Sequence, residues 1–221
     1  MTNLAPFIYQ PPQHELITIY EDDDLIVIDK PAGLLSVMGR LPEHQDSAYL
    51  RILEKFPQAK VTHRLDMATS GLLMFAKHRE AEIAISKMFQ ARSVDKHYIA
   101  LVQGCIQNKG SIDVPLITDW ENRPRQIVHF ELGKSAKTLY QLLAYDEKID
   151  QSRVLLQPIT GRSHQLRVHL MHIGHPILGD KLYHPQPQQF HLGRMALHAT
   201  YLEFSHPLSG QYLQLTSPVP F

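Results

Sequence analysis

Apolar runs along the first half of the chain predict strands and an amphipathic helix. Residues 15–20 (ELITIY) and 24–30 (DLIVIDK) are β-branched, apolar runs around an acidic turn, which is typical of two strands. The short apolar run 71–76 (GLLMFA) predicts a buried strand. In residues 78–92, apolar side chains recur at i, i+3, i+4 and i+7, so this stretch is expected to be an amphipathic helix.

Capping residues and helical spacing predict two more helices. The first covers residues 46–56, with Asp46 or Ser47 as its N-cap. The second covers residues 163–174, where Ser163 can cap the first turn.

Strands outnumber helices and often follow one another directly. Further strands are predicted at 97–104, 137–146, 153–159, 197–204 and 211–216. This order lacks the strict alternation of a doubly wound α/β protein. We therefore expect an α+β fold, with a large, mainly antiparallel sheet flanked by helices.

Composition limits the class of protein. The 221 residues are 43% hydrophobic and 20% charged, which is typical of one globular domain. The single cysteine, Cys105, fits a reducing compartment, and no signal peptide or membrane-spanning apolar run is evident. We expect a cytoplasmic monomer with an N-terminal arm (residues 1–14) and one catalytic domain (residues 15–221).

Charge is distributed unevenly, although the formal net charge is +0. Residues 15–29 hold six acids and no Lys or Arg, whereas residues 151–179 hold three arginines and no acid. A surface formed by the second segment would attract a polyanion even though the whole molecule is neutral.

Asp66 is the first candidate for chemistry. It lies in an expected turn just before a buried strand, where a side chain is held in place and stays reachable. Arg64 could keep the carboxylate ionised or bind a phosphate. The alternative is that Asp66 caps the turn through the amides of Thr69 or Ser70. Local chemistry leaves both interpretations open and favours the cap.

The segment 159–180 is the second candidate. Arg162 and His164 lie at the start of the expected helix, where free amides and the helix dipole favour an anion, and Arg167 follows one turn later. An ordinary solvated helix face is the alternative, but such faces normally mix both signs of charge. The histidines of this segment could also suggest a metal site, yet residues 151–179 contain no Asp, Glu or Cys to complete the ligand shell.

Two further positions could contact RNA or could be structural. Tyr98 starts a strand and could stack on a base, or could be a half-buried core tyrosine. The loop 119–126 (DWENRPRQ) places Arg123 and Arg125 beside the only tryptophan, Trp120. These arginines could contact phosphates or could lie in a plain surface loop.

Five ordered motifs together resemble the RluA-type pseudouridine synthases. The segment 63–71 (HRLDMATSG) is similar to the signature of that family. The other matching motifs are 30–33 (KPAG), 96–100 (KHYIA), 161–169 (GRSHQLRVH) and 175–180 (HPILGD). A single HRLD sequence would be weak evidence, whereas five motifs in order, within a resemblance covering residues 24 to about 218, are specific.

The resemblance implies a fold, an activity and a substrate. The fold would be a single α+β catalytic domain whose large mixed sheet bends around a central cleft. The activity would be isomerisation of uridine to pseudouridine in RNA, without a metal or any cofactor. Only fourteen residues precede the first expected strand, so an S4-type RNA-binding domain is not expected. The chain most resembles the small dual-specificity branch, which modifies stem-loops of 23S rRNA and tRNA.

The resemblance also implies roles for individual residues. Asp66 would be the nucleophile, and Arg167 would form the ion pair that orients it. Arg64 would enter the RNA stack in place of the flipped uridine. Tyr98 would be a catalytic residue that stacks on the extruded uracil and could help to remove its C5 proton, with water or another group as the alternative proton acceptor. Arg123, Arg125, Arg162 and His164 would contact the RNA.

Two other functions stay open at this point. One is an RNA-binding or chaperone module, in which Asp66 is merely structural. The other is a hydrolase with a histidine-bound metal. No Walker A, dinucleotide-binding or serine-hydrolase motif is present, so a nucleotide cofactor is not expected.

Overall fold

The computed structural model describes residues 8–186 and 192–221, so residues 1–7 of the expected arm lie outside it. Residues 8–16 contain no helix or strand. The strands in the described ranges are β1 (Ile17–Glu21), β2 (Leu25–Lys30), β3 (Lys60–Val61), β4 (Ser70–Ala76), β5 (Asp95–Gln103), β6 (Lys109–Asp113), β7 (Leu116–Thr118), β8 (Gln126–Val128), β9 (Lys137–Asp146), β10 (Gln151–Pro158), β11 (Leu197–Ser205) and β12 (Tyr212–Thr216). The helices are α1 (Ala48–Lys55), α2 (Arg79–Ala91), α3 (Gln165–His172) and the short 3-10 helix η1 (Pro42–His44).

One ten-stranded sheet runs through the molecule. Its path is β1-β2-β4-β11-β5-β10-β9-β6, with β3 added at β4 and β12 added at β11, and β7 and β8 form a separate hairpin. The β4–β11 pair is parallel, and the other pairs are antiparallel. The predicted α+β fold with a mixed, mainly antiparallel sheet is therefore confirmed.

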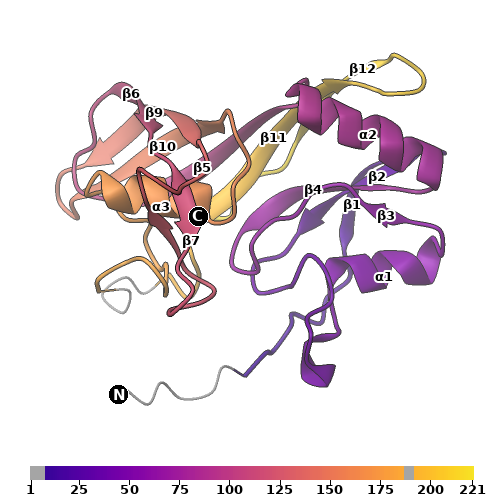
Figure 1. The fold of residues 1–221 in the computed structure, drawn as a ribbon, viewed down its shortest axis with the longest axis horizontal. Coiled ribbons are helices and arrows are strands. Elements are labelled where there is room, and N and C mark those ends of the chain that lie inside the picture. Colours follow the sequence, from indigo (N-terminus) through magenta and orange to yellow (C-terminus); the bar gives the residue numbers. More distant parts are fainter. Residues whose placement is uncertain (1–7, 187–191) are drawn as a thin grey trace.

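Strand β11 joins two halves of the molecule. It pairs with β4 of the half that carries α1 and α2, and with β5 of the half that carries α3 (Figure 1). Gly71 permits the junction, because a Cβ at that position would lie only 2.2 Å from the carbonyl oxygen of Ala199 on β11. Its φ of +108° also lies in the region that favours glycine.

Both faces of β4 are buried, because its side chains point alternately toward α2 and toward α1. Leu72 and Met74 pack with Ile85 of α2, whereas Leu73 and Phe75 pack with α1. Figure 1 shows the two helices on opposite sides of these strands. All seven residues of β4 are buried, so the loop that precedes it is attached to a rigid strand.

Most elements start and end within about two residues of their predicted positions, but one predicted cap is wrong. Ser47 caps α1, accepting a hydrogen bond from the amide of Leu50 at 3.2 Å. Ser163 does not cap α3, because the helix starts after His164, which has a φ of 55°. Instead, the Gln165 side chain holds the segment that leads into the helix. Its Oε1 accepts hydrogen bonds from the Arg162 amide and the Thr160 hydroxyl.

Candidate active site

The loop that carries Asp66 is anchored from beneath by a buried lysine. Lys30, at the end of β2, is 0% exposed, and its Nζ donates to the carbonyls of Pro31 (2.8 Å), Leu34 (2.7 Å) and Met67 (3.2 Å). Three acceptors match the three N–H groups of an ammonium. Burial nevertheless lowers the pKa of Lys30 to about 7, an effect that the nearby charge of Asp66 partly opposes.

Lys30→Met is expected to lower the free energy of unfolding by about 2–4 kcal/mol, because it leaves buried carbonyls without donors. Urea denaturation measures this change. Lys137→Met is the matched control, since Lys137 pairs with Asp113 at an exposed site, and we expect it to cost at most about 1 kcal/mol. A Lys30→Met protein as stable as the control would contradict the anchoring role.

The same pair of variants predicts a pH dependence. The pKa of Lys30 falls from 10.5 to about 7 on folding, so between these values the unfolded chain binds more protons than the folded chain. Stability then rises with pH in that interval. The wild-type protein should therefore gain stability relative to Lys30→Met between about pH 7 and pH 9. Equal pH profiles would mean that the buried amine keeps its proton.

Ser36 and His63 also hold the signature segment in place through hydrogen bonds. Ser36 Oγ donates to the carbonyl of Leu65 at 2.6 Å and accepts from its amide at 3.0 Å. His63 Nε2 accepts from the amide of Met74, and burial lowers the pKa of His63 to about 3. His63 is therefore a neutral structural acceptor at physiological pH.

The Asp66 carboxylate faces a cleft and is bound by Arg167. Its side chain is 25% exposed, and Oδ2 accepts from Arg167 Nη1 at 2.9 Å. The turn is closed by the backbone, since the Thr69 amide donates to the Asp66 carbonyl at 3.1 Å. The described residues show no hydrogen bond from the amides of Thr69 or Ser70 to the carboxylate, so the turn-cap alternative is not observed.

One guanidinium connects two carboxylates. Arg167 Nε and Nη2 donate to the two oxygens of Asp180, both at 2.7 Å, while Nη1 reaches Asp66. The Arg167 side chain is 5% exposed and that of Asp180 is 0% exposed. Burial opposes the charge, but the bonds to Asp180 and the charges of both acids raise the pKa of Arg167 above its ordinary value. The bidentate pair with Asp180 fixes the direction in which Nη1 points.

Asp180 is a site residue to which the sequence motifs alone assigned no role. A signal existed, because Asp180 is the first acid after the acid-free stretch 151–179 and ends the motif HPILGD. It also accepts hydrogen bonds from the amides of Leu182 and Tyr183, at 2.9 and 3.2 Å, so it is held independently of Arg167.

His164 forms a second contact beside Asp66. Its Nε2 lies 3.8 Å from Asp66 Oδ1, and its Nδ1 lies 2.7 Å from the Tyr183 hydroxyl. That hydroxyl also accepts from the Gln126 amide at 2.7 Å. Burial lowers the pKa of His164, against the opposing effect of Asp66. When the hydroxyl donates to Nδ1, a neutral His164 carries its hydrogen on Nε2, the nitrogen that faces Asp66.

Tyr98 lies in the same cleft as Asp66. It is a partly buried residue of β5, and its pKa is raised by burial and by the charge of Asp66. The ring therefore carries a protonated hydroxyl at physiological pH.

The remaining candidate residues differ in their positions. Arg64 and Arg162 are exposed on the cleft lining, and Arg162 Nε donates to the carbonyl of Ser135. Arg123 also lines the cleft, with its guanidinium 4.9 Å from the Trp120 ring. Arg125 is not among the lining residues. Its guanidinium lies over the ring of Tyr183 at 5.4 Å. No ion pair joins Arg64 to Asp66 among the described residues; Arg167 binds the acid instead.

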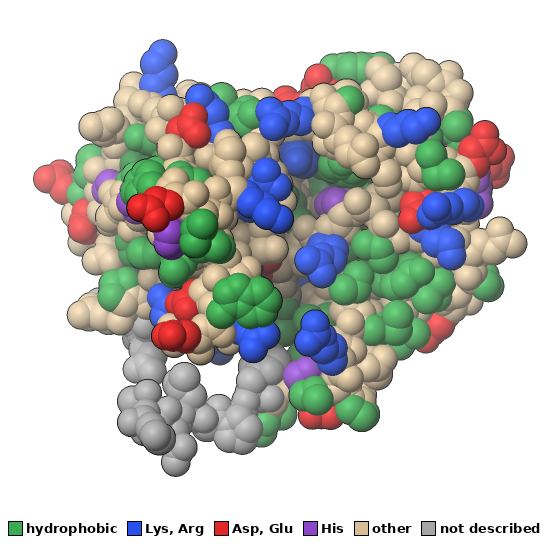
Figure 2. Space-filling model, in the orientation of Figure 1, with side chains coloured by type: hydrophobic (Ala, Val, Ile, Leu, Met, Phe, Trp, Pro, Cys, Tyr) green, Lys and Arg blue, Asp and Glu red, His purple; other side chains and the backbone are tan. Residues whose placement is uncertain are grey.

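The cleft is strongly basic although the chain is neutral. In the described ranges it is lined by nine Lys or Arg residues and three acids, Asp66, Asp95 and Glu203. Figure 2 shows Lys and Arg side chains gathered along the central hollow of this face. The positive electrostatic potential of such a cleft attracts a polyanion.

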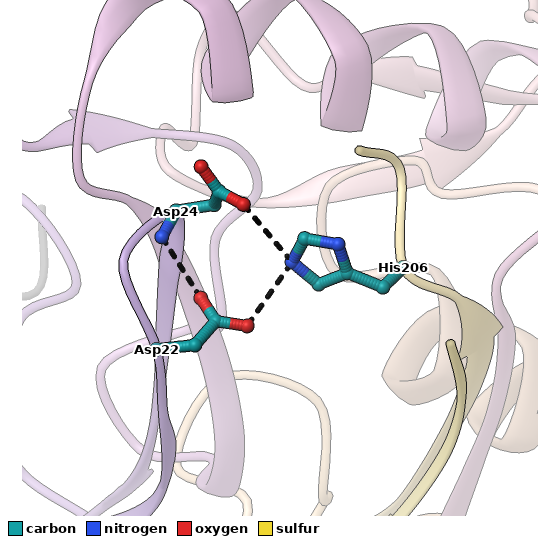
Figure 3. A group of neighbouring side chains, drawn as sticks. All are labelled: Asp22, Asp24 and His206. Carbon is teal, nitrogen blue, oxygen red and sulfur yellow. Dashed lines mark hydrogen bonds and ion pairs between the residues drawn. The ribbon is translucent and has the colours of Figure 1, made fainter. Parts of the chain in front are cut away.

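The metal hypothesis gains no support from the four histidines of the basic segment. The only group of three possible ligands among the described residues is Asp22, Asp24 and His206, which lies outside the cleft (Figure 3). His206 Nδ1 accepts from the amides of Leu208 and Ser209, so in neutral His206 Nε2 carries the hydrogen. That nitrogen lies 3.1 Å from Asp22 Oδ2 and 3.7 Å from Asp24 Oδ2. It has no free lone pair for a metal.

The chain is similar to known proteins in both sequence and fold. Residues 24–172 match the family model described as RNA pseudouridylate synthase. The dual-specificity RNA pseudouridine synthase RluA of Pasteurella multocida is 46% identical over 220 residues, covering 99% of this chain and 100% of that protein. The RluA protein of Escherichia coli K12 is 46% identical over 215 residues, covering 96% and 98%. Human RNA pseudouridylate synthase domain containing 1 superposes with a TM-score of 0.78 at 30% identity, covering 96% of this chain and 87% of that chain.

Proposed function

The chain belongs to the RNA pseudouridine synthase family, and from this membership we propose that it isomerises uridines in stem-loops of both 23S rRNA and tRNA. One observation of the molecule carries the proposal: a partly exposed Asp66 carboxylate is held by Arg167 on the wall of a basic cleft. The dual specificity rests on about 46% identity to RluA enzymes over nearly their full length. The bacterial relatives and the RNA substrate favour a cytoplasmic location.

The reaction needs an ionised carboxylate next to the sugar. The N1–C1′ bond of uridine breaks, the uracil turns, and C5 bonds to C1′ as the C5 proton leaves. Asp66 acts at the sugar, either by attack at C1′ or by removing a sugar proton, and both roles require its negative charge. Arg167 donates a hydrogen bond to the carboxylate and fixes its direction. The products contain the same atoms as the substrate, so no oxidant or hydrolytic water is consumed.

The cleft also offers groups for holding a flipped nucleotide. Removing a base from its stack costs a few kcal/mol, and stacking on an aromatic ring returns about 1–3 kcal/mol. Among the aromatic residues that line the cleft, Tyr98 is close enough to Asp66 for its pKa to be raised by the charge of that acid, and exposed Arg64 can fill the gap left in the RNA. Arg123, Arg162 and His164 extend the contact along the RNA, and Arg125 supports it through Tyr183.

Tritium release tests the proposal. Transcripts of the tRNA anticodon stem-loop and of 23S rRNA fragments are labelled at uridine C5, and isomerisation releases the label to water. We expect release from both RNAs. Release from one RNA would reject the dual specificity, and release from neither would reject the enzyme. An RNA-binding module would instead bind the same transcripts, with strong salt dependence, and release nothing.

A further inference from the structure

Arg194 occupies the wall of the Asp66 cleft in a fixed orientation. Its Nη2 donates to Ser70 Oγ and its Nε to the carbonyl of Met195 at 3.3 Å. Its guanidinium lies 5.5 Å from the ring centre of Phe221. Ser70 is itself held, because its Oγ lies 2.7 Å from His198 Nδ1. A long cationic side chain is thus set in place before any ligand binds.

This cation has no acidic partner in the described parts of the chain. Within residues 8–186 and 192–221 no ion pair involves Arg194, unlike Arg167, which has two carboxylates. The segments 1–7 and 187–191 contain no Asp or Glu that could serve instead. Half-burial lowers the pKa of Arg194, with only the more distant charge of Asp29 opposing this effect. A partly desolvated charge of this kind gains most from an anion that arrives with a ligand.

Arg194 lines the same cleft as Asp66 and contacts the strand that follows it. Ser70, which it contacts, is the first residue of β4 and lies four residues after Asp66. Lys30 bonds the same loop at Met67, and its pKa responds to the charges of both Asp66 and Arg194. A nucleotide whose ribose contacts Asp66 carries a phosphate on each side, and Arg194 is a cation on the wall of the same cleft.

We propose that Arg194 binds a phosphate of the substrate RNA beside the reacting uridine. A guanidinium has five N–H groups, and the structure uses two of those of Arg194. The other three can bind phosphate oxygens in the planar arrangement that arginine favours. This inference rests on the proposed function, because it needs RNA in the cleft.

The salt dependence of RNA binding tests this role. A fluorescent tRNA anticodon stem-loop is titrated with wild-type protein and with Arg194→Gln over a range of salt concentrations. Loss of one phosphate contact should reduce the slope of log K against log[salt] by about 0.7–0.9 and weaken binding by about tenfold at low salt. A purely structural role would leave the slope unchanged.

Arg153→Gln is the matched control. Arg153 also contacts Phe221, donating to its carbonyl at 2.8 Å with its guanidinium 5.9 Å from the ring centre, but it is not among the cleft-lining residues. This variant loses the same charge, and the wild-type slope is expected for it. If Arg194→Gln does not fold, Arg194→Lys decides: we expect the slope to be kept and the affinity to fall about threefold, since lysine keeps the charge and loses the planar donors.

The outcomes separate this inference from the proposed function. If wild-type protein binds RNA and releases tritium while Arg194→Gln keeps the slope and affinity of Arg153→Gln, the phosphate role is overturned and the enzyme remains. Unchanged affinity in Arg194→Lys would overturn the role in the same way. If wild-type protein releases no tritium from either RNA, the proposed function fails first and the inference fails with it.

Discussion

Asp66→Asn is expected to reduce tritium release by about 10⁴-fold or more, while RNA affinity stays within about threefold of wild type. Asparagine keeps an oxygen that can accept from Arg167 Nη1, so the geometry is preserved while the negative charge is lost. A neutral amide can neither attack at C1′ nor remove a proton from the sugar. The loss should therefore appear in the chemical step and not in binding.

Single-turnover assays with excess protein measure this loss separately from binding. Asp95→Asn is the matched control, because Asp95 is another acid of the same cleft but bonds to Gln157 at 2.8 Å. We expect the control to lose less than about tenfold. If Asp66→Asn retained about a tenth of the wild-type rate, the carboxylate would not be the reacting group, and the RNA-binding module would become the better interpretation.

Arg167→Met is expected to lower the free energy of unfolding by about 3–5 kcal/mol and to remove most of the activity. The substitution leaves the Asp180 carboxylate, whose side chain is 0% exposed, without its cation. It also frees Asp66 from the donor that directs it toward the cleft. Chemical denaturation measures the first effect and single-turnover tritium release the second.

A double variant separates the two effects. Arg167→Met combined with Asp180→Asn removes both buried charges, and the asparagine oxygen can still accept from the amides of Leu182 and Tyr183. Stability should largely return, whereas activity should stay low because Asp66 remains undirected. If activity returned along with stability, Arg167 would only stabilise the fold, and orientation of Asp66 by the ion pair would be wrong.

Strong periodicity made most of the fold predictable. The continuous apolar run of β4 and the helical spacing of α2 each correspond to a buried face. The strands β3, β6, β7 and β8 were missed because they have only two to five residues and carry little apolar pattern. Pairing with longer neighbours creates such strands, and pairing is not visible in a local window.

The residues of the candidate site could be predicted one by one, but their contacts could not be read from local pattern, and the expected Asp66–Arg167 ion pair came from the family resemblance alone. The motifs named Asp66 and Arg167, yet these residues are separated by 101 positions, and spacing alone says nothing about their contact. Local reasoning favoured a turn cap for Asp66 because it considered only neighbours in sequence. Asp180 and Arg194 were missed for the same reason: their partners are Arg167 and Ser70, which only the folded chain brings near.

The parallel β4–β11 pair sets the order in which the two halves of the molecule can assemble during synthesis. Strand β11 begins at Leu197, and without it β4 and β5 have no common neighbour. A chain that is being synthesised therefore contains Asp66 and Arg167 before it contains the strand that joins the two halves of the molecule. The contact between Asp66 and Arg167 therefore depends on a strand that is synthesised after both residues and that joins their two halves of the sheet.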